Sequence, residues 1–357
     1  MTRVAVVYGT RPEMIKLAPV IKLLGDRAFG VHTGQHFDPF LSDHILEEMS
    51  FPSPQVNLGV GGQTRAAQIG NAILRLEEAV MGSDAVIVQG DTNSGLAGAL
   101  VANALEIPLF HVEAGLRSYD RRMPEEHNRV LIDHLADVCW APTDENMANL
   151  ASEGITGGRA IKTGNPIVEA LAAIAPPRED VDEILGNFEV QLRGFILATL
   201  HRPENVDDAG RLEQILNHLG RLPLPVLFPI HPRTRARIEA AGIVIPDRLK
   251  VVDPVGYREF LGLLGSSRLV VSDSGGVQEE VSILKVPLIV LRRSTERPEV
   301  LGTFASLTDS PDEMSSLATD LLGSGDEGLR RLADIPCPYG DGMASMRMAR
   351  SLEKSIL

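Results

Sequence analysis

Short runs of β-branched and other apolar residues alternate along the chain with stretches of helical periodicity. This alternation constrains the fold more than any other feature, because short strands separated by helices build βαβ units and a parallel sheet. In the first half we predict helices such as Ser94–Leu105 and Glu126–Leu135 between the strands Val4–Tyr8, Gly30–Thr33, Asp84–Gln89, Pro108–Val112 and Asp137–Ala141. The first half is therefore expected to be an α/β domain.

The pattern repeats after Ala175-Pro176-Pro177-Arg178-Glu179-Asp180, which has the composition of a linker. A chain of 357 residues is long enough for two domains with separate cores. We expect two Rossmann-like domains facing across a cleft, where the carboxyl ends of both sets of strands would hold a ligand. The second set of predicted strands is Phe195–Thr199, Val226–Ile230, Leu249–Val252, Leu269–Ser272 and Pro287–Leu291.

Charge, cysteine content and missing motifs exclude several classes of protein. A net charge of -14 disfavours nucleic acid as a partner. The only cysteines, Cys139 and Cys337, form neither a disulfide framework nor a zinc knuckle, so we expect inert thiols in a reducing cytoplasm. The sequence has no GxGxxG after a strand, no GxxxxGK[ST], no HExxH and no membrane-length apolar run. We therefore expect no cofactor, no metal and no membrane association.

Polar, glycine-rich segments follow almost every predicted strand. Because such exits share one edge of a parallel sheet, their Arg, Asp, Glu and His side chains indicate a binding site rather than ordinary loop solvation. The exits are Gly9-Thr10-Arg11, Gly34-Gln35-His36, Gly90-Asp91-Thr92, Glu113-Ala114-Gly115, His201-Arg202-Pro203-Glu204-Asn205, His231-Pro232-Arg233 and Ser272-Asp273-Ser274-Gly275-Gly276.

The segment GTRPEMIK brings Arg11, Glu13 and Lys16 together at the first exit. One interpretation is a solvated helix start, in which Pro12 fits an early helical position and Glu13 suits the helix dipole. The other is an anion site, because Arg11 offers a planar fork for phosphate. In that second case we expect Glu13 to pair locally with the cations.

The segment DSGGVQEE carries the strongest phosphate signal. Ser274-Gly275-Gly276 ends a strand and begins a helix, whose free N–H groups and dipole attract an anion. We place Glu279 and Glu280 in the first turn of this helix. They either complement the dipole or accept hydrogen bonds from ribose hydroxyls, and the sequence alone favours neither role.

Three carboxylates, Asp91, Glu113 and Glu125, are candidates for acid–base chemistry. Asp91 could instead cap the helix that starts near Ser94, and Glu125 could simply open the helix Glu126–Leu135. Glu113 directly follows a buried strand, and no structural role for a charged residue is evident at that position.

Taken jointly, the motifs resemble those of the non-hydrolysing UDP-N-acetylglucosamine 2-epimerases over nearly the whole chain. The resemblance implies the glycosyltransferase-B architecture, with a C-terminal helix over 346–357 that crosses back to the first domain. The domains would then be 1–168 plus 345–357 and 169–344. The motifs are GTRPE, TGQH, GDT, HVEAGLRS, MPEEHNR, TGNP, HRPEN, SDSGGVQEE, TERPE and PYGDGMAS.

The resemblance also assigns roles to individual residues. It places the catalytic carboxylates at Asp91, Glu113 and Glu125, the phosphate and leaving-group residues at Arg11 and His201, and a supporting lysine at Lys16. The UDP-binding set would comprise Arg11, His201, Arg202, His231, Ser274, Gly275, Gly276, Glu280 and Arg297.

The implied reaction is reversible epimerisation of UDP-GlcNAc to UDP-ManNAc at C2, through elimination and re-addition of UDP. Alternatives are a 2-epimerase for a modified UDP-HexNAc, such as a uronate or a 3-substituted sugar, and an inverting glycosyltransferase. We also expect a homodimer that serves polysaccharide biosynthesis.

One segment departs from the family pattern. Some bacterial relatives are activated by a second UDP-GlcNAc molecule, held partly by glutamines after TGQH and by an arginine in the next helix. The matching positions here are Asp38, Ser42 and Ile69, although Arg65 lies one helical turn from Ile69. A carboxylate would repel a second diphosphate sugar, so we expect no such activation.

Overall fold

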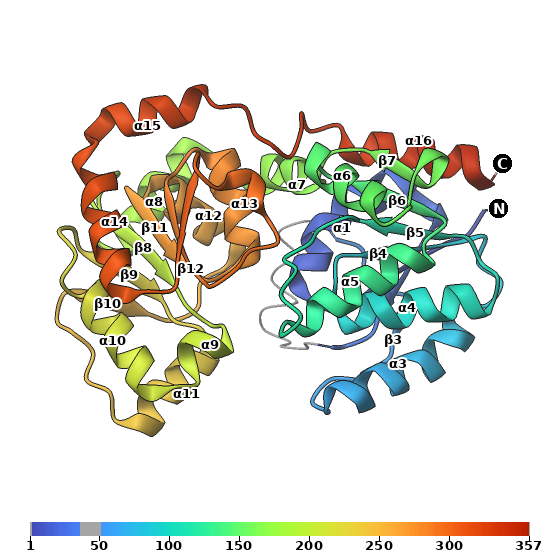
Figure 1. Cartoon of the computed structure of the whole chain (residues 1–357), viewed down its shortest axis with the longest axis horizontal. Helices are drawn as coiled ribbons and strands as arrows, with labels where there is room; N and C mark the ends of the chain where they lie inside the picture. The colour runs from blue at the N-terminus through green and yellow to red at the C-terminus, as the bar shows by residue number, and fades with distance from the viewer. Residues whose placement is uncertain (1, 36–50, 357) are drawn as a thin grey trace. The chain divides into compact units, whose positions relative to one another are not determined.

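The computed structural model describes residues 2–35 and 51–356. The chain divides into two compact units, Met1–Ile174 with Tyr339–Leu357, and Ala175–Pro338 (Figure 1). The first unit continues past residue 168, the boundary expected from sequence, because it includes the helix α7 (Ile167–Ile174). Ile167, Leu171 and Ile174 of this helix are buried, and α7 packs against α1 (Arg11–Leu24).

The first unit is built on a parallel sheet of seven strands in the described part of the chain, ordered β3-β2-β1-β4-β5-β6-β7. In its centre, Val7 of β1 lies opposite Val31 and Val88. The strands are β1 (Val4–Tyr8), β2 (Ala28–His32), β3 (Val56–Asn57), β4 (Ala85–Gln89), β5 (Leu109–Val112), β6 (Val138–Ala141) and β7 (Ala160–Lys162). The helices besides α1 and α7 are α3 (Arg65–Val80), α4 (Asn93–Ala104), α5 (Pro124–Leu135), α6 (Asp144–Ser152) and α16 (Ala344–Ile356), with short 3-10 turns at Gly25–Arg27 and Gly157–Arg159.

The second unit repeats this architecture, with a parallel sheet of six strands within residues 175–338, ordered β10-β9-β8-β11-β12-β13. Its strands are β8 (Ile196–Thr199), β9 (Val226–Pro229), β10 (Leu249–Val252), β11 (Leu269–Ser272), β12 (Leu288–Leu291) and β13 (Ala305–Thr308). Its helices are α8 (Arg178–Asn187), α9 (Pro203–Val206), α10 (Ala209–Leu219), α11 (Pro232–Ala241), α12 (Tyr257–Ser266), α13 (Gly275–Leu284), α14 (Pro311–Gly323) and α15 (Gly325–Asp334), with a 3-10 turn at Pro298–Val300.

All ten strands predicted from the sequence are present, and their observed ends differ from the predicted ones by at most two residues. Three further strands, β3, β7 and β13, carry no clear apolar run, and each lies at the edge of its sheet. An edge strand is covered on fewer sides, so its sequence needs less hydrophobic surface and gives a weaker signal. The two predicted Rossmann-like sheets are therefore confirmed.

The starts of the helices follow from local sequence. Pro12 lies in the first turn of α1, as predicted, where its missing N–H costs no helical hydrogen bond. The hydroxyl of Thr92 caps α4 by accepting a 2.9 Å hydrogen bond from the Gly95 N–H. Since Thr92 is the cap, Asp91 is not needed for that purpose.

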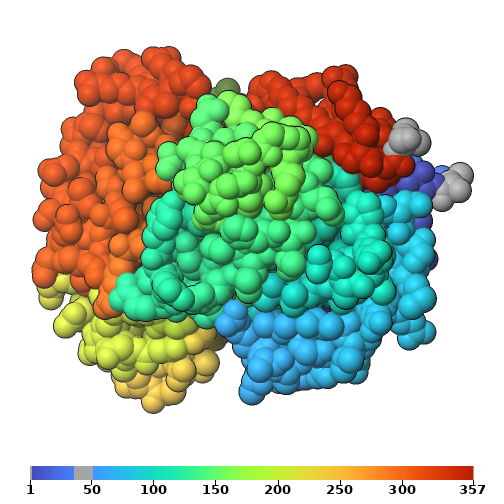
Figure 2. Space-filling model, turned by 45° about the vertical axis from the view of Figure 1, so that its right-hand side comes forward, coloured from blue at the N-terminus to red at the C-terminus, as the bar shows by residue number. Residues whose placement is uncertain are grey.

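The C-terminal helix α16 packs on the first unit, against α1, as the family resemblance implied. Figure 2 shows this segment in red at the surface, beside segments of the first unit. The indole N–H of Trp140 on β6 donates a 3.1 Å hydrogen bond to Ser351 of α16. Among the described helices, none is long and apolar enough to cross a membrane.

Candidate active site

The candidate residues of the first unit follow β1, β4 and β5, which are neighbours in the sheet. Because the strands are parallel, their carboxyl ends share one edge, and the loops that carry Arg11, Asp91 and Glu113 begin there.

Glu13 joins two of these loops from a fully buried position. One carboxylate oxygen accepts hydrogen bonds from the Gly9 N–H at 3.0 Å and from the Thr10 hydroxyl at 2.8 Å, and the other accepts from the Thr92 hydroxyl at 2.7 Å. Burial raises the pKa of Glu13 to about 7, although these hydrogen bonds act to lower it. The hydrogen bonds of Glu13 therefore link the loop after β1 to the loop after β4. The sequence had suggested instead a local pairing of Glu13 with Arg11 and Lys16.

Lys16 of α1 and Glu113, which follows β5, form a buried ion pair with 2.6 Å between Nζ and Oε1. The side-chain amide of Gln89 donates to the second oxygen of Glu113, and the amide of Asn165 donates to Oε1 at 3.4 Å. Lys16 is thus placed as a support for Glu113.

The backbone of Glu113 is in the left-handed region, with φ at 71°. A residue with a side chain adopts this conformation at a cost of about 1 kcal/mol or more, and such strain is concentrated at functional sites. The N–H groups of Glu113 and Ala114 both donate to the carbonyl of Trp140, each at 3.1 Å, which fixes the turn that presents the carboxylate.

Asp91 is held by Arg129 of α5. The guanidinium donates to Asp91 Oδ2 through Nε, at 3.0 Å, and through Nη2, while Nη1 donates to Glu126. Arg129 is almost completely buried, whereas the side chain of Asp91 is 28% exposed. One oxygen of Asp91 is thus anchored while part of the carboxylate stays accessible to a ligand.

Glu125 and Glu126 have opposite environments although they are adjacent on α5. Glu126 is buried and accepts hydrogen bonds from the Ser118 hydroxyl at 2.7 Å and from the Tyr119 N–H at 2.8 Å. Burial acts to raise the pKa of Glu126, but these bonds and the charge of Arg129 hold the pKa below its usual value. Glu125 is exposed, and no hydrogen bond or ion pair of its side chain is present within residues 2–35 and 51–356. Its carboxylate is therefore available to a substrate.

A second network lies behind these residues and escaped the sequence analysis. His111 of β5 contacts Asp133 of α5, which also accepts hydrogen bonds from Gly115 N–H at 3.0 Å and from Arg117 at 2.7 Å. Burial would raise the pKa of Asp133, but His111 and Arg117 hold it below its usual value. The spacing of Glu126, Arg129 and Asp133, which puts three charged residues on one side of α5, is the signal that could have revealed both networks.

In the second unit, the fully buried Asp273 organises the loop that follows β8. Its carboxylate accepts hydrogen bonds from the backbone N–H groups of His201, at 3.1 Å, and Arg202, at 3.0 Å, and from the Asn205 amide at 3.1 Å. The His201 ring lies 3.2 Å from the same carboxylate. Desolvation lowers the pKa of His201, while Asp273 acts in the opposite direction. The neighbouring His231 ring lies 5.6 Å from that of His201.

The helix α13 begins at Gly275, directly after Ser274, as predicted. A Cβ atom at Gly275 would lie 2.8 Å from the Glu296 carboxylate and 2.9 Å from the Arg297 guanidinium. A larger residue at this position would displace the end of one of these two paired side chains, which glycine leaves undisturbed. The first turn of α13 therefore presents backbone N–H groups at the carboxyl edge of the sheet, as an anion site requires.

The two glutamates of α13 have different partners. Glu279 accepts a 2.7 Å hydrogen bond from Arg297, whose guanidinium also contacts Glu296. Glu280 accepts a 2.8 Å hydrogen bond from the Tyr257 hydroxyl. Neither glutamate lies in the first turn of α13, which differs from the prediction, because the helix already begins at Gly275. A purely dipolar role therefore does not describe them.

Two of the three positions at which the chain departs from the family pattern, Asp38 and Ser42, lie outside the described residues, as does His36 of the second strand exit. Ile69 is partly buried and packs against the core of the first unit. Arg65 is exposed and donates to the side chain of Asn128 at 2.7 Å.

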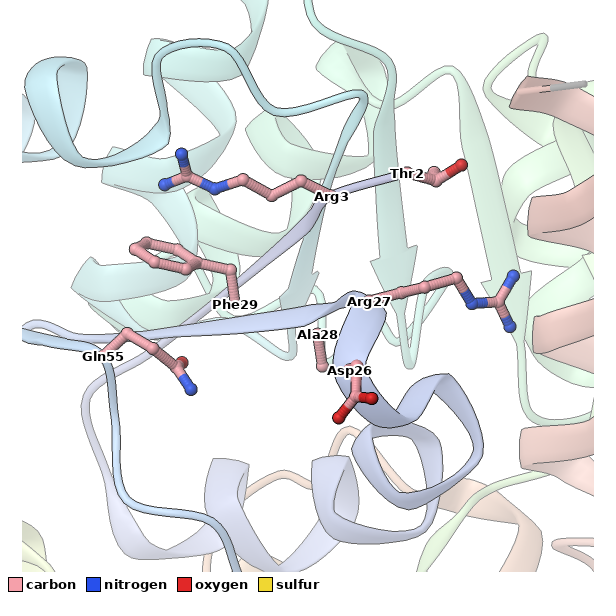
Figure 3. Close-up of a pocket in the computed structure, with 7 residues that line it drawn as sticks. All are labelled: Thr2, Arg3, Asp26, Arg27, Ala28, Phe29 and Gln55. Atoms are coloured by element: carbon pink, nitrogen blue, oxygen red, sulfur yellow. The ribbon is translucent and has the colours of Figure 1, made fainter.

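A pocket of about 300 Å³ lies at the opposite edge of the first sheet (Figure 3). The Arg3 guanidinium covers the Phe29 ring at 3.7 Å, and Arg27 pairs with Glu353 of α16 at 3.2 Å. This pocket contains none of the residues predicted to bind or react. Its lining comprises Thr2, Arg3, Asp26, Arg27, Ala28, Phe29 and Gln55.

Comparison with known proteins gives full-length matches. A family model described as UDP-N-acetylglucosamine 2-epimerase matches residues 27–353. The UDP-N-acetylglucosamine 2-epimerase of Methanocaldococcus jannaschii is 39% identical, and the match covers 98% of each protein. The crystal structure of that archaeal enzyme in complex with UDP-GlcNAc and UDP has a TM-score of 0.89 at 37% identity, over 99% of this chain and 100% of that one. The UDP-2,3-diacetamido-2,3-dideoxy-D-glucuronate 2-epimerase of Pseudomonas aeruginosa is 36% identical over 99% of each protein.

Proposed function

Because the chain belongs to the UDP-N-acetylglucosamine 2-epimerase family, we propose that it interconverts UDP-GlcNAc and UDP-ManNAc by eliminating and re-adding UDP. The family assignment made from the sequence motifs is confirmed by these matches. The protein is thus an epimerase that does not hydrolyse its nucleotide sugar.

Elimination solves the chemical difficulty of the reaction. The hydrogen at C2 has no adjacent carbonyl to acidify it, so direct removal of a proton would be slow. When a base takes that proton while the C1–O bond to UDP breaks, the electron pair forms the C1–C2 double bond of a glycal and UDP leaves as the anion. UDP then adds back to C1 as an acid delivers a proton to the opposite face of C2.

This scheme needs an acid and a base on opposite faces of the sugar, and the carboxyl edge of the first unit supports it. Asp91 is anchored by Arg129, Glu113 is paired with Lys16, and Glu125 is exposed. We propose these three carboxylates as the catalytic groups.

The departing UDP needs positive and hydrogen-bonding groups at its phosphates. We propose that the α13 N-terminus at Ser274, Gly275 and Gly276 binds the diphosphate and that Glu280 binds the nucleoside. The further proposed contacts are Arg11, Lys16, His201, Arg202, His231 and Arg297.

The observation that carries the proposal is the pairing of a strained, buried Glu113 with Lys16 at the same sheet edge as Asp91. Incubation with UDP-GlcNAc in D2O, followed by NMR of the anomeric region, tests it. We expect UDP-ManNAc to form and deuterium to enter C2 of both sugars. Epimerised product that keeps its original C2 hydrogen would contradict the elimination route.

The same experiment separates the rival functions. An inverting glycosyltransferase would form no UDP-ManNAc and exchange no hydrogen at C2, and a regulator that binds without turnover would leave the spectrum unchanged. An Asp91→Asn variant that still binds UDP is the matched control, because it should lose exchange while retaining the nucleotide.

The 36% identity to the Pseudomonas enzyme supports a second candidate, a 2-epimerase for a modified UDP-HexNAc. A panel of UDP-sugars that differ at C3 and C6 distinguishes the two by the rate of C2 exchange. We further propose a cytoplasmic homodimer that supplies polysaccharide biosynthesis, which native mass spectrometry and cell fractionation would test.

A further inference from the structure

The ring of His111 lies between two oxygen atoms in the interior of the first unit. Its Nδ1 is 2.6 Å from Asp133 Oδ1, and its Nε2 is 2.8 Å from the carbonyl oxygen of Gly90. Both His111 and Asp133 have fully buried side chains. His111 lies on β5, Asp133 on α5, and Gly90 directly follows β4. All three elements belong to the first unit (Figure 1).

Both of these oxygens can only accept a hydrogen bond. The Gly90 carbonyl carries no hydrogen, and Asp133 Oδ2 already accepts from Gly115 and Arg117, as an ionised carboxylate does. A neutral imidazole has one N–H and one lone pair, so one of the two contacts would bring lone pairs together. The geometry is satisfied only when both ring nitrogens carry hydrogen.

The surrounding charges match such a ring. Asp133 accepts a hydrogen bond from the buried Arg117, and Arg117 also donates to Glu153, which is 23% exposed, through two nitrogens at 2.7 Å each. Glu153 in turn lies 3.3 Å from the half-exposed ring of His134. A doubly protonated His111 would place a second positive group, beside that of Arg117, against the buried Asp133 carboxylate.

The hydrogen bond to Gly90 acts on the residue that precedes Asp91. Gly90 has φ at 66°, and its carbonyl orientation sets the peptide plane that enters Asp91. On the other side, Asn128 donates to the Asp91 carbonyl at 2.9 Å, and Arg129 holds the Asp91 carboxylate. Both peptide planes that flank Asp91 and its side chain are therefore anchored, with His111 supplying the contact from within the sheet.

We propose that His111 is a positioning residue for Asp91 and that it acts as a two-donor bridge from Asp133 to the Gly90 carbonyl. The catalytic part of this inference rests on the proposed role of Asp91. The bridge itself rests only on the geometry of the first unit.

The first experiment measures the bridge without turnover. The protein is labelled with ¹⁵N-histidine, and the ring nitrogens of its nine histidines are recorded at pH 7.5. We expect one ring whose two nitrogens both show the shifts of N–H nitrogens and whose signals are missing from His111→Gln. If the His111 ring shows one N–H and one bare nitrogen, the bridge is wrong.

The second experiment measures the effect on Asp91. The glutamine side chain ends in one NH2 group and one oxygen, so it cannot replace two donors on opposite sides of the ring, and the Gly90 peptide should lose part of its constraint. We expect kcat to fall about 100-fold, as for displacement of a catalytic group by about 1 Å, with KM for UDP-GlcNAc and the Kd of UDP within about threefold of wild type.

The control is His134→Gln, which makes the same chemical change on a half-exposed side chain whose ring lies 3.3 Å from Glu153, at the outer side of the network. It should retain wild-type kcat. A His111→Gln enzyme with wild-type kcat would overturn the positioning role, as would a parallel loss of UDP binding, which a merely structural defect produces. If the wild-type protein epimerises no UDP-sugar, the proposed function fails, while the ¹⁵N spectrum still decides the bridge. If His111→Gln does not fold, His111→Asn takes its place, both for assigning the ring signals and for the kinetic comparison.

Discussion

Replacing Glu13 by glutamine should change how the stability of the first unit depends on pH. Burial raises the pKa of Glu13 from 4.5 to about 7, so folding favours the protonated carboxyl. The stability that this group contributes is fully present below its unfolded pKa, near 4.5, and is lost as the pH rises through about 7. Glutamine does not titrate, so the variant lacks this loss.

The expected magnitude follows from the size of the shift. At about 1.4 kcal/mol per pKa unit, a rise from 4.5 to about 7 corresponds to roughly 3 kcal/mol. Most of this change, on the order of 2 to 3 kcal/mol, falls between pH 5 and pH 8. We expect Glu13→Gln to be less stable than wild type at pH 5, because it disturbs hydrogen bonds to Gly9, Thr10 and Thr92. The free energy of unfolding of the variant should then rise relative to that of wild type as the pH rises.

The assay uses the single tryptophan of the chain, Trp140, which is fully buried in the first unit and reports its unfolding. Urea unfolding is followed by Trp140 fluorescence at pH 5, 6, 7 and 8 for both proteins. The control is Glu126→Gln, because the pKa of Glu126 is lowered rather than raised. The stability contributed by Glu126 is present above its unfolded pKa and is lost only in more acidic solution, so this variant should differ from wild type by a constant amount from pH 5 to 8. A pH-independent difference between Glu13→Gln and wild type over that range would refute the argument.

Further outcomes test the proposed site. Glu125→Gln should lower kcat by orders of magnitude without changing the melting temperature, because the side chain is exposed; an altered melting temperature with normal kcat would assign it a structural role. Arg11→Lys should lower kcat at least about tenfold, since lysine lacks the bidentate fork. Near-normal activity would instead support the interpretation of GTRPE as a solvated helix start. Gly275→Ala should weaken UDP binding in calorimetry, because the added methyl meets Glu296 and Arg297 at 2.8 and 2.9 Å; unchanged affinity would argue against a phosphate site there. Initial rates should depend hyperbolically on UDP-GlcNAc, and UDP-ManNAc alone should turn over; sigmoidal kinetics would indicate that an effector site exists in another form.

The environment of each carboxylate could not be read from the sequence. Glu125 and Glu126 are adjacent and chemically alike, yet Glu126 is buried against Ser118 and Arg129 while Glu125 is exposed. The rotation of α5 against the sheet decides this difference, and that rotation depends on packing across the whole unit. For the same reason Glu13, which the sequence suggested as a partner of neighbouring cations, is a buried link to Thr92.

What the sequence by itself determined was the class of fold, the central strands, the start of α13 and the family. These features depend on local signals: apolar runs of strand length, a proline or glycine where the backbone requires one, and motifs at the strand exits. Only the tertiary structure decided which side chains meet. The contacts of Lys16 with Glu113, of His111 with Gly90 and Asp133, and of Arg129 with Asp91 join segments far apart in the chain. A local pattern, such as the spacing of the charged residues on α5, can show that side chains share one side of a helix. The partners that they meet depend on strand order and on helix packing.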